Sequence, residues 1–288
     1  MLQQTPAALS APVLLDEVPF FAQDAYQCGP AALATVLGAS HIAVTPDDLV
    51  PLVYVPERQG SFQVELIAAA RSYDRLAYEI PRTLNALLTE ISAGNPVLVM
   101  QNLGVSWYPK WHYAVVKGFN VENRKLILNS GLQENYEISL SIFERTWARA
   151  EHWAIVVLEP GTMPASAEPL QYFNAVVALE AGTDAGVVAN AYESGLQTWP
   201  TDRNLLMGYG NLSYGIGEAQ IAADNFKKVT DTYPDYAPAY NNLAQILFES
   251  GDKAQARQYA EKAVALGGDF RELYQETLRT IVDDAERN

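Results

Sequence analysis

The sequence has little sulfur and little positive charge. It contains one cysteine and three histidines among 288 residues, too few for a cysteine-rich metal site or an intrachain disulfide, so we expect no metal and no cofactor. Nineteen Lys and Arg residues stand against 34 Asp and Glu residues, giving a net charge of −15. This balance argues against nucleic acid as a partner, because nucleic acid attracts positive charge. No apolar run reaches 18 residues, so the sequence predicts no membrane span.

The composition predicts a folded protein of two domains. Apolar residues make up 49% of the chain and charged residues 18%, a profile typical of globular proteins. A Pro/Gly-rich stretch over residues 159–164 separates a mixed region from one that is almost all helical in pattern. We therefore expect an α+β domain over residues 13–160 and an all-α domain over residues 165–288.

The first residues predict a location. Met1-Leu2-Gln3-Gln4 has neither the basic region nor the apolar region of a signal peptide. It resembles a start left after an export signal has been removed. We expect a periplasmic or otherwise exported bacterial protein, lipid-anchored in its full-length form, with a cytoplasmic location as the alternative.

The C-terminal region repeats every 34 residues. Pro200 and Pro234 close equivalent segments, and successive frames begin near Pro169, Arg203 and Ala237. Each frame places large and small residues in a repeated pattern that lets paired antiparallel helices stack. The third frame resembles a tetratricopeptide repeat, and residues 271–286 are predicted to cap the array. An irregular helical bundle is the alternative.

The first helices of these pairs are predicted to form a concave surface that captures a peptide. Polar and aromatic side chains suit that role, because amides pair with peptide backbone and rings supply contact area. The residues expected to line this surface are Asn204, Tyr209, Asn211, Tyr240, Asn241 and Asn242.

The N-terminal region mixes helical and strand patterns. Helices are predicted first, and an antiparallel sheet follows, which is the order of an α+β domain. The predicted helices cover residues 29–38, a segment starting at 45, and residues 61–71, 83–93 and 141–149. The predicted strands cover residues 96–100, 113–119, 125–128 and 153–158.

The single cysteine stands at a predicted helix start. Cys28 directly precedes Gly29-Pro30, and a thiolate there faces unpaired N–H groups and the positive end of the helix dipole. Both effects lower a thiol pKa, which suits a nucleophile. A buried cysteine that only fills space is the alternative.

Four residues suit a catalytic site around this cysteine. Gln23 can donate to an oxyanion together with the Cys28 backbone N–H. His112 opens a strand after the aromatic segment 107–111 and is the best general base; His41 and His152 are weaker candidates. Asn129 ends the next strand and can orient the imidazole.

Together these residues resemble the papain-like cysteine peptidases, and more narrowly the bacteriocin-leader-processing peptidase family. The likeness covers about residues 17–159 and rests on Gln23, the segment Cys28-Gly29-Pro30-Ala31, the segment starting at His112, and Asn129. It implies a papain-like α+β fold with Cys28 as nucleophile, His112 as base and Gln23 in the oxyanion hole. Gln27 and Asn129 stand where exporter members of the family carry Asp.

The resemblance implies a cysteine peptidase that acts on a peptide or protein. The repeat domain would then recruit the substrate or a protein partner, and the aromatic segment 107–113 would form a wall of the substrate groove, unless its rings belong to the core or to a lid. Two alternatives stay open. One is a papain-like amide hydrolase or acyltransferase, and the other is a non-catalytic scaffold that binds peptides.

Overall fold

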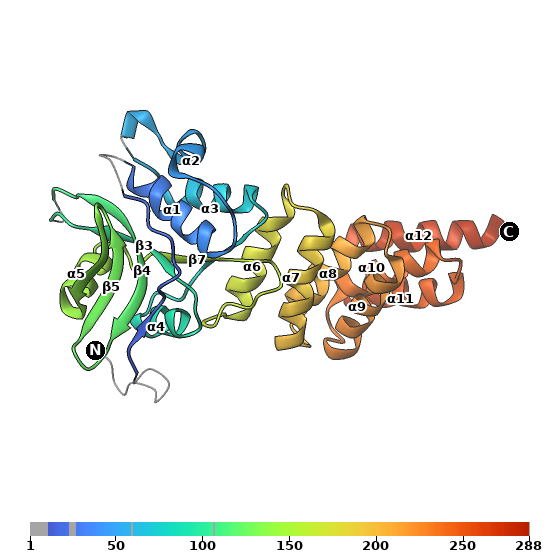
Figure 1. The fold of residues 1–288 in the computed structure, drawn as a ribbon. Helices are drawn as coiled ribbons and strands as arrows, with labels where there is room; N and C mark the ends of the chain where they lie inside the picture. Colours follow the sequence, from blue (N-terminus) through green and yellow to red (C-terminus); the bar gives the residue numbers. More distant parts are fainter. Residues whose placement is uncertain (1–10, 23–26, 59, 106, 288) are drawn as a thin grey trace. The chain divides into compact units, whose positions relative to one another are not determined.

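The computed structural model describes residues 11–22, 27–58, 60–105 and 107–287. The chain divides into two compact units, Met1–Asp184 and Ala185–Asn288. The first unit combines helices with an antiparallel sheet, and the second consists of helices (Figure 1). The predicted fold class, an α+β domain followed by a helical repeat domain, is confirmed.

The sheet of the first unit has seven strands in the order β2-β7-β3-β4-β5-β6, with β1 paired to β4. All pairings are antiparallel. β1 lies beside Gly118, where a Cβ atom would come within 2.7 Å of the Val13 carbonyl oxygen. The strands are β1 (Val13–Leu14), β2 (Leu76–Glu79), β3 (Val97–Asn102), β4 (Trp111–Asn120), β5 (Lys125–Ser130), β6 (Gln133–Ser139) and β7 (Ala154–Leu158).

The helices of this unit begin where the sequence signals a start. Thr45 and Asp48 form a capping box at α2, and the Thr83 hydroxyl accepts from the Ala86 N–H at α4, so capping residues hold the starts of both helices. The helices are α1 (Cys28–Ala39), α2 (Pro46–Val53), α3 (Gln63–Ser72), α4 (Leu84–Ser92), α5 (Leu140–Ala148) and α6 (Pro169–Glu180), and a short 3-10 helix covers Pro56–Arg58.

One core of this unit lies between the sheet and helices α1, α2 and α3. Burying such a continuous apolar cluster is the main force that holds helices on a sheet. Because side chains alternate along a strand, this core takes every second residue of β3, β4 and β7. The buried members include Leu33, Leu37, Leu49, Leu66, Leu98, Tyr113, Val115, Ile155 and Val157.

Helix α6 belongs to the first compact unit, although it starts at the first repeat frame. The segment before it is held by Glu90, whose buried carboxylate accepts from the N–H groups of Ala165 and Ser166 and from the Ser166 hydroxyl. Arg71 donates to the Ala178 carbonyl oxygen within α6. The predicted domain limits at 160 and 165 stay a prediction, and compactness places the division after Asp184.

The second unit keeps the 34-residue period in its helix starts. Residues 203, 237 and 271 begin α8, α10 and α12, and residues 185, 219 and 253 begin α7, α9 and α11. Equal spacing means that each helix pair repeats the geometry of the one before. The helices are α7 (Ala185–Thr198), α8 (Arg203–Gly215), α9 (Ala219–Thr232), α10 (Ala237–Glu249), α11 (Lys253–Leu266) and α12 (Arg271–Arg287).

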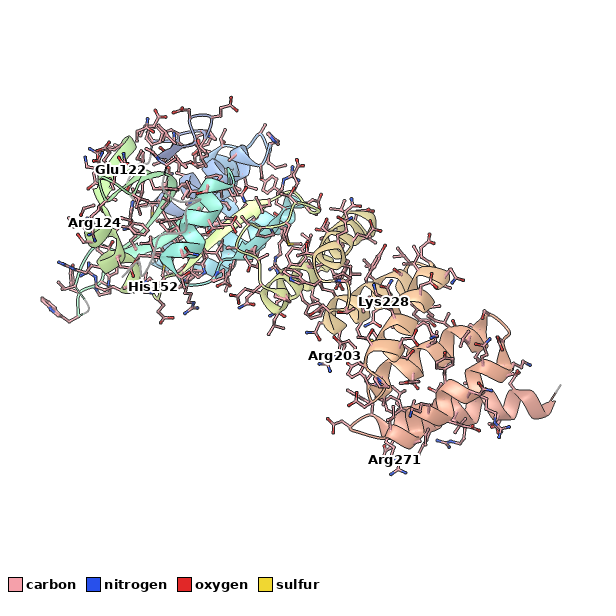
Figure 2. All side chains as sticks on the ribbon, turned by 90° about the horizontal axis from the view of Figure 1, so that it is seen from below. Glu122, Arg124, His152, Arg203, Lys228 and Arg271 are labelled. Atoms are coloured by element: carbon pink, nitrogen blue, oxygen red, sulfur yellow. The ribbon has the colours of Figure 1, made fainter. Side chains whose placement is uncertain are left out.

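Small residues allow these helices to pack closely. A Cβ atom on Gly210 of α8 would come within 2.5 Å of the Phe226 ring in α9, so only glycine permits this approach. Arg203, labelled in Figure 2, stacks over the Tyr236 ring at 4.6 Å from its centroid. This cation–π contact fixes the start of α8 against the loop before α10.

Candidate active site

Cys28 is the first residue of α1, as the sequence predicts. Its side chain is half-buried and packs against the main core. The first turn of α1 holds no acidic residue, so the positive end of the helix is not neutralised from within the helix. The thiol therefore lies at the edge of the core, next to unpaired helix N–H groups.

The strand next to Cys28 is β4, at Tyr113. Met100 of β3 is opposite Tyr113 in the ladder, and its N–H donates to Trp153 on the other side of β3. Tyr113 therefore forms a non-hydrogen-bonded pair with Met100, and its own N–H points toward β5. The β4–β5 ladder starts only at Val115. The Tyr113 N–H therefore lies outside the β4–β5 ladder, and it interacts with the Cys28 sulfur.

Burial raises the pKa of the Cys28 thiol above its ordinary value. The N–H groups of Tyr113, Gly29 and Cys28 itself act in the opposite direction, because they favour the thiolate, but burial is the larger effect. The sequence predicts a lowered pKa for this thiol, and that prediction is wrong. A position at a helix start does not guarantee a lowered pKa when the same position packs into a core.

His112 precedes Tyr113 in β4, so strand alternation directs its side chain to the face opposite that of Tyr113, where its ladder partner Gln101 donates to Thr146 of α5. Its Nε2 atom is 2.9 Å from the Ser130 hydroxyl oxygen. Burial, with a smaller effect from the charge of Lys110, lowers the pKa of His112. The ring is therefore neutral near pH 7. When Nε2 donates to Ser130, Nδ1 carries the lone pair that can accept a proton.

Asn129 makes no hydrogen bond with His112 among the described residues. Its amide nitrogen donates to the Pro19 carbonyl oxygen at 3.1 Å, and its amide oxygen accepts from the Asn135 N–H at 3.4 Å. Asn129 is opposite Val115, and His112 is three residues before Val115, so strand alternation puts the two side chains on opposite faces. Ser130, one residue further on, shares the face of His112.

Reasoning from the sequence therefore did not identify Ser130 as the partner of His112. The alternation of side chains along β5 could have indicated it. Among the described residues, no hydrogen bond joins the Cys28 thiol to the imidazole of His112. The roles of Cys28, His112 and Asn129 in catalysis stay predictions. Gln23, the predicted oxyanion donor, lies outside the described residues.

The other two histidines do not suit the role of general base, because His41 lies far from Cys28 and His152 has partners of its own. His41 lies two residues past the far end of α1, a helix that is about 17 Å long at 1.5 Å per residue, and it is exposed. His152, labelled in Figure 2, lies 2.8 Å from a Glu144 carboxylate oxygen and packs edge-on against Trp147. These contacts give His152 a structural role before β7.

The aromatic segment before His112 is exposed. Trp107 is 86% exposed and Tyr108 73%, so these rings do not belong to the core. Asn102 holds the loop that carries them, because its side-chain oxygen accepts from the N–H groups of Gly104 and Lys110, both at 2.9 Å. Large exposed apolar side chains grouped beside a site are typical of a binding surface.

Comparison with known proteins agrees with this fold. Residues 15–155 match the model of the Peptidase_C39 like family, and residues 217–280 match a tetratricopeptide repeat model. The chain consists of a peptidase C39-like domain followed by tetratricopeptide repeats, as the resemblance in the sequence implied. No curated protein sequence matches the chain.

Solved structures are similar to each part of the chain. A putative C39-like peptidase from Bacillus anthracis is 18% identical, with a TM-score of 0.44 over 51% of this chain and 98% of that one. The Sgt2 tetratricopeptide domain from Aspergillus fumigatus is 20% identical, with a TM-score of 0.38 over 42% of this chain and 82% of that one. The chaperone SycD from Yersinia enterocolitica is 15% identical, with a TM-score of 0.38 over 41% and 85%.

Proposed function

We propose that the protein is a cysteine peptidase in which Cys28 is the nucleophile and His112 the general base. The observation that supports this most directly is the position of the Cys28 sulfur, at the start of α1 and beside the free N–H of the residue that follows His112. Membership of the first domain in a C39-like family supports the same chemistry.

The reaction we propose is amide hydrolysis in two steps. His112 takes the thiol proton, the sulfur attacks the peptide carbonyl carbon, and the N–H of Cys28 stabilises the oxyanion, with Gln23 proposed as a second donor. One such donor is worth about 3 kcal/mol. His112 then protonates the leaving amine, and water attacks the acyl-enzyme to release the acid. In this step Nε2 of His112 donates to the Ser130 hydroxyl oxygen, which leaves Nδ1 free to accept the proton.

The repeat domain is proposed to bind the substrate or a protein partner. Tetratricopeptide repeats support a role in peptide or protein binding, and no helix of the described ranges is long and apolar enough to cross a bilayer. Among the residues predicted to line the concave surface of the repeats, Tyr209, Tyr240 and Asn241 are buried. The Asn242 amide donates to the Asn211 amide oxygen at 3.2 Å on an exposed surface, which leaves these two as the better contact residues.

Replacement of Cys28 and His112 tests the proposal. Cys28→Ala should abolish hydrolysis of the protein's peptide substrates in a proteomic cleavage assay, with the melting temperature nearly unchanged. His112→Ala should reduce cleavage by about 10²–10⁴-fold, while His41→Ala, at the other end of α1, should leave cleavage unchanged. Full activity in Cys28→Ala would refute the proposal.

A non-catalytic peptide-binding scaffold is the second candidate. The raised pKa of the thiol favours it, because a protonated thiol is a poor nucleophile. Under this alternative, His112→Ala would not change the rate at which iodoacetamide alkylates Cys28. Under the peptidase proposal, the same variant would slow alkylation near neutral pH, since the base that removes the thiol proton is gone.

A further inference from the structure

The start of α3 packs against the start of α1, beside the nucleophile. The Ser61 hydroxyl oxygen lies 2.3 Å from the position that a Cβ atom on Gly29 would occupy, and the Leu66 side chain lies 3.6 Å from it. Tyr113 donates from its hydroxyl group to the Ser61 carbonyl oxygen at 3.1 Å. Ser61 is thus next to both residues that flank the cysteine sulfur, Gly29 in α1 and Tyr113 in β4.

Two polar atoms of Ser61 and Glu65 are buried without a hydrogen-bond partner among the described residues. Within the described part of the chain, neither the Ser61 hydroxyl oxygen nor the Oε2 atom of Glu65 has a hydrogen-bond partner. Glu65 lies in the first turn of α3, next to Leu66. A buried polar group without a partner costs about 1–3 kcal/mol, more if it is charged. Buried polar groups in native proteins nearly always have a partner, so each exception calls for an explanation such as a catalytic role, an ion or a water molecule.

The pKa of Tyr113 responds to both Cys28 and Glu65. Burial is the main reason that the pKa of Tyr113 is raised, and the charges of Cys28 and Glu65 raise it further. Both groups therefore act on the same phenol ring. A negative carboxylate that acts on Tyr113, whose N–H interacts with the Cys28 sulfur, favours cations and disfavours anions in this region.

We propose that Ser61 and Glu65 form a subsite beside Cys28 that binds a cationic group of the peptide, either a lysine or arginine side chain or a free amino terminus. The Glu65 carboxylate accepts from the ammonium or guanidinium group, and the Ser61 hydroxyl accepts a further hydrogen bond. This inference deepens the proposed peptidase function and rests on it for the identity of the ligand as a peptide.

Charged thiol reagents test the subsite without any need for amide hydrolysis. The protein has a single cysteine, so 2-aminoethyl methanethiosulfonate and 2-sulfonatoethyl methanethiosulfonate both report on Cys28. In each case the thiolate attacks the sulfenyl sulfur, a disulfide forms and methanesulfinate leaves. The rate of each reagent with Cys28 is divided by its rate with free 2-mercaptoethanol. This ratio should be higher for the cationic reagent. Glu65→Gln should lower that preference about 10-fold.

Matched variants separate local charge from net charge and from misfolding. Glu79→Gln removes one charge from an exposed position on β2 and should leave the preference unchanged. Glu65→Asp keeps the charge and should retain most of it. An unchanged preference in Glu65→Gln, or an equal fall in Glu79→Gln, would overturn the subsite even if the protein proves to be a peptidase.

Two peptidyl chloromethyl ketones assign the cationic group. One carries a lysine side chain and a blocked amino terminus, and the other a free amino terminus and only neutral side chains. Each alkylates the sulfur with loss of chloride. The ketone whose rate falls about 10-fold in Glu65→Gln identifies the source of the charge. If neither ketone depends on Glu65, a cationic peptide group is not the ligand, and the inference fails whatever the outcome for Cys28→Ala.

Discussion

Burial acts on both proposed catalytic residues in the same sense, because it disfavours their charged forms. It raises the pKa of Cys28 and lowers the pKa of His112. The resting site therefore holds a neutral thiol and a neutral imidazole, not an ion pair. Substrate attack then requires proton transfer from sulfur to His112, and the rate depends on the fraction of imidazole that is unprotonated.

The pH dependence of activity follows from the raised pKa of Cys28 and the lowered pKa of His112. Activity should be lost as the pH falls through the pKa of His112, and because that pKa is lowered, the acid limb of kcat/KM should lie below the range of an ordinary histidine, about 6.5. In the free protein, alkylation of Cys28 should still be rising at pH values where an ordinary cysteine has levelled off. Stopped assays across a pH series measure both. An acid limb above pH 7 would contradict the assignment.

Ser130 should matter more than Asn129 for the histidine. Ser130→Ala removes the hydrogen-bond partner that the His112 ring has among the described residues and should lower kcat several-fold while KM changes little. Ser130→Thr keeps the hydroxyl and should restore most of the rate. Asn129→Ala should mainly lower the melting temperature, because Asn129 fastens Pro19 and Asn135. A larger loss of kcat in Asn129→Ala would support the original assignment.

Residue types at the site could be predicted from the sequence, but contacts between them could not. Cys28 at a helix start and His112 at a strand start follow from local patterns. The partner of His112 depends on the register of β4 against β5, which includes an irregularity between Val116 and Gly118. Register is set by packing across the sheet, so the sequence could not decide between Asn129 and its neighbour Ser130.

At the scale of elements, the segment before α6 is the part of the first unit most dependent on one side chain. Glu90 is fully buried and accepts four hydrogen bonds, one of them from Asn95 and the others from residues 165 and 166. Tyr78 adds to this fastening, because its hydroxyl accepts from the Glu168 N–H at 3.0 Å. Burial is the main reason that the pKa of Tyr78 rises to about 12.

Replacing Glu90 should therefore destabilise the first unit. Glu90→Ala leaves several buried donors without an acceptor and should lower the free energy of unfolding by about 3 kcal/mol, at 1–3 kcal/mol for each unsatisfied group. Glu79→Ala, at an exposed position, serves as the control and should change it by under about 0.5 kcal/mol. Urea unfolding monitored by tryptophan fluorescence measures both. Equal stabilities would show that residues 165–168 are not needed for the fold.

Some elements were visible in the sequence and others were not. The helices and the apolar strands β3, β4, β5 and β7 have clear periodic patterns. The edge strand β6 was missed because Gln133–Ser139 is mostly polar and exposed, and β2 because it has only four residues. Such strands form because a neighbour offers free backbone groups, and that information is not local in the sequence.

At the scale of the whole molecule, the division of labour can be tested by removing the second unit. A chain ending at Asp184 keeps α6 and the contacts of Glu90 and should remain soluble. We expect it to cleave a short peptide at the full rate but a full-length protein substrate at least about 10-fold more slowly, because recruitment is lost. Size-exclusion chromatography and cleavage assays measure both. Aggregation of this chain would assign the repeats a stabilising role instead.

The Asn102 network has a thermodynamic consequence for ligand binding. Its side chain ties both ends of the loop that presents Trp107 and Tyr108, and Arg149 donates to its carbonyl oxygen at 2.9 Å. Ordering a free loop on binding costs about 0.5–1.5 kcal/mol for each side chain that is immobilised, besides the backbone. A peptide that settles on these rings meets a loop that is already held at Gly104 and Lys110. Its calorimetric signature should be a negative heat-capacity change from the covered apolar surface, with only a small entropic penalty.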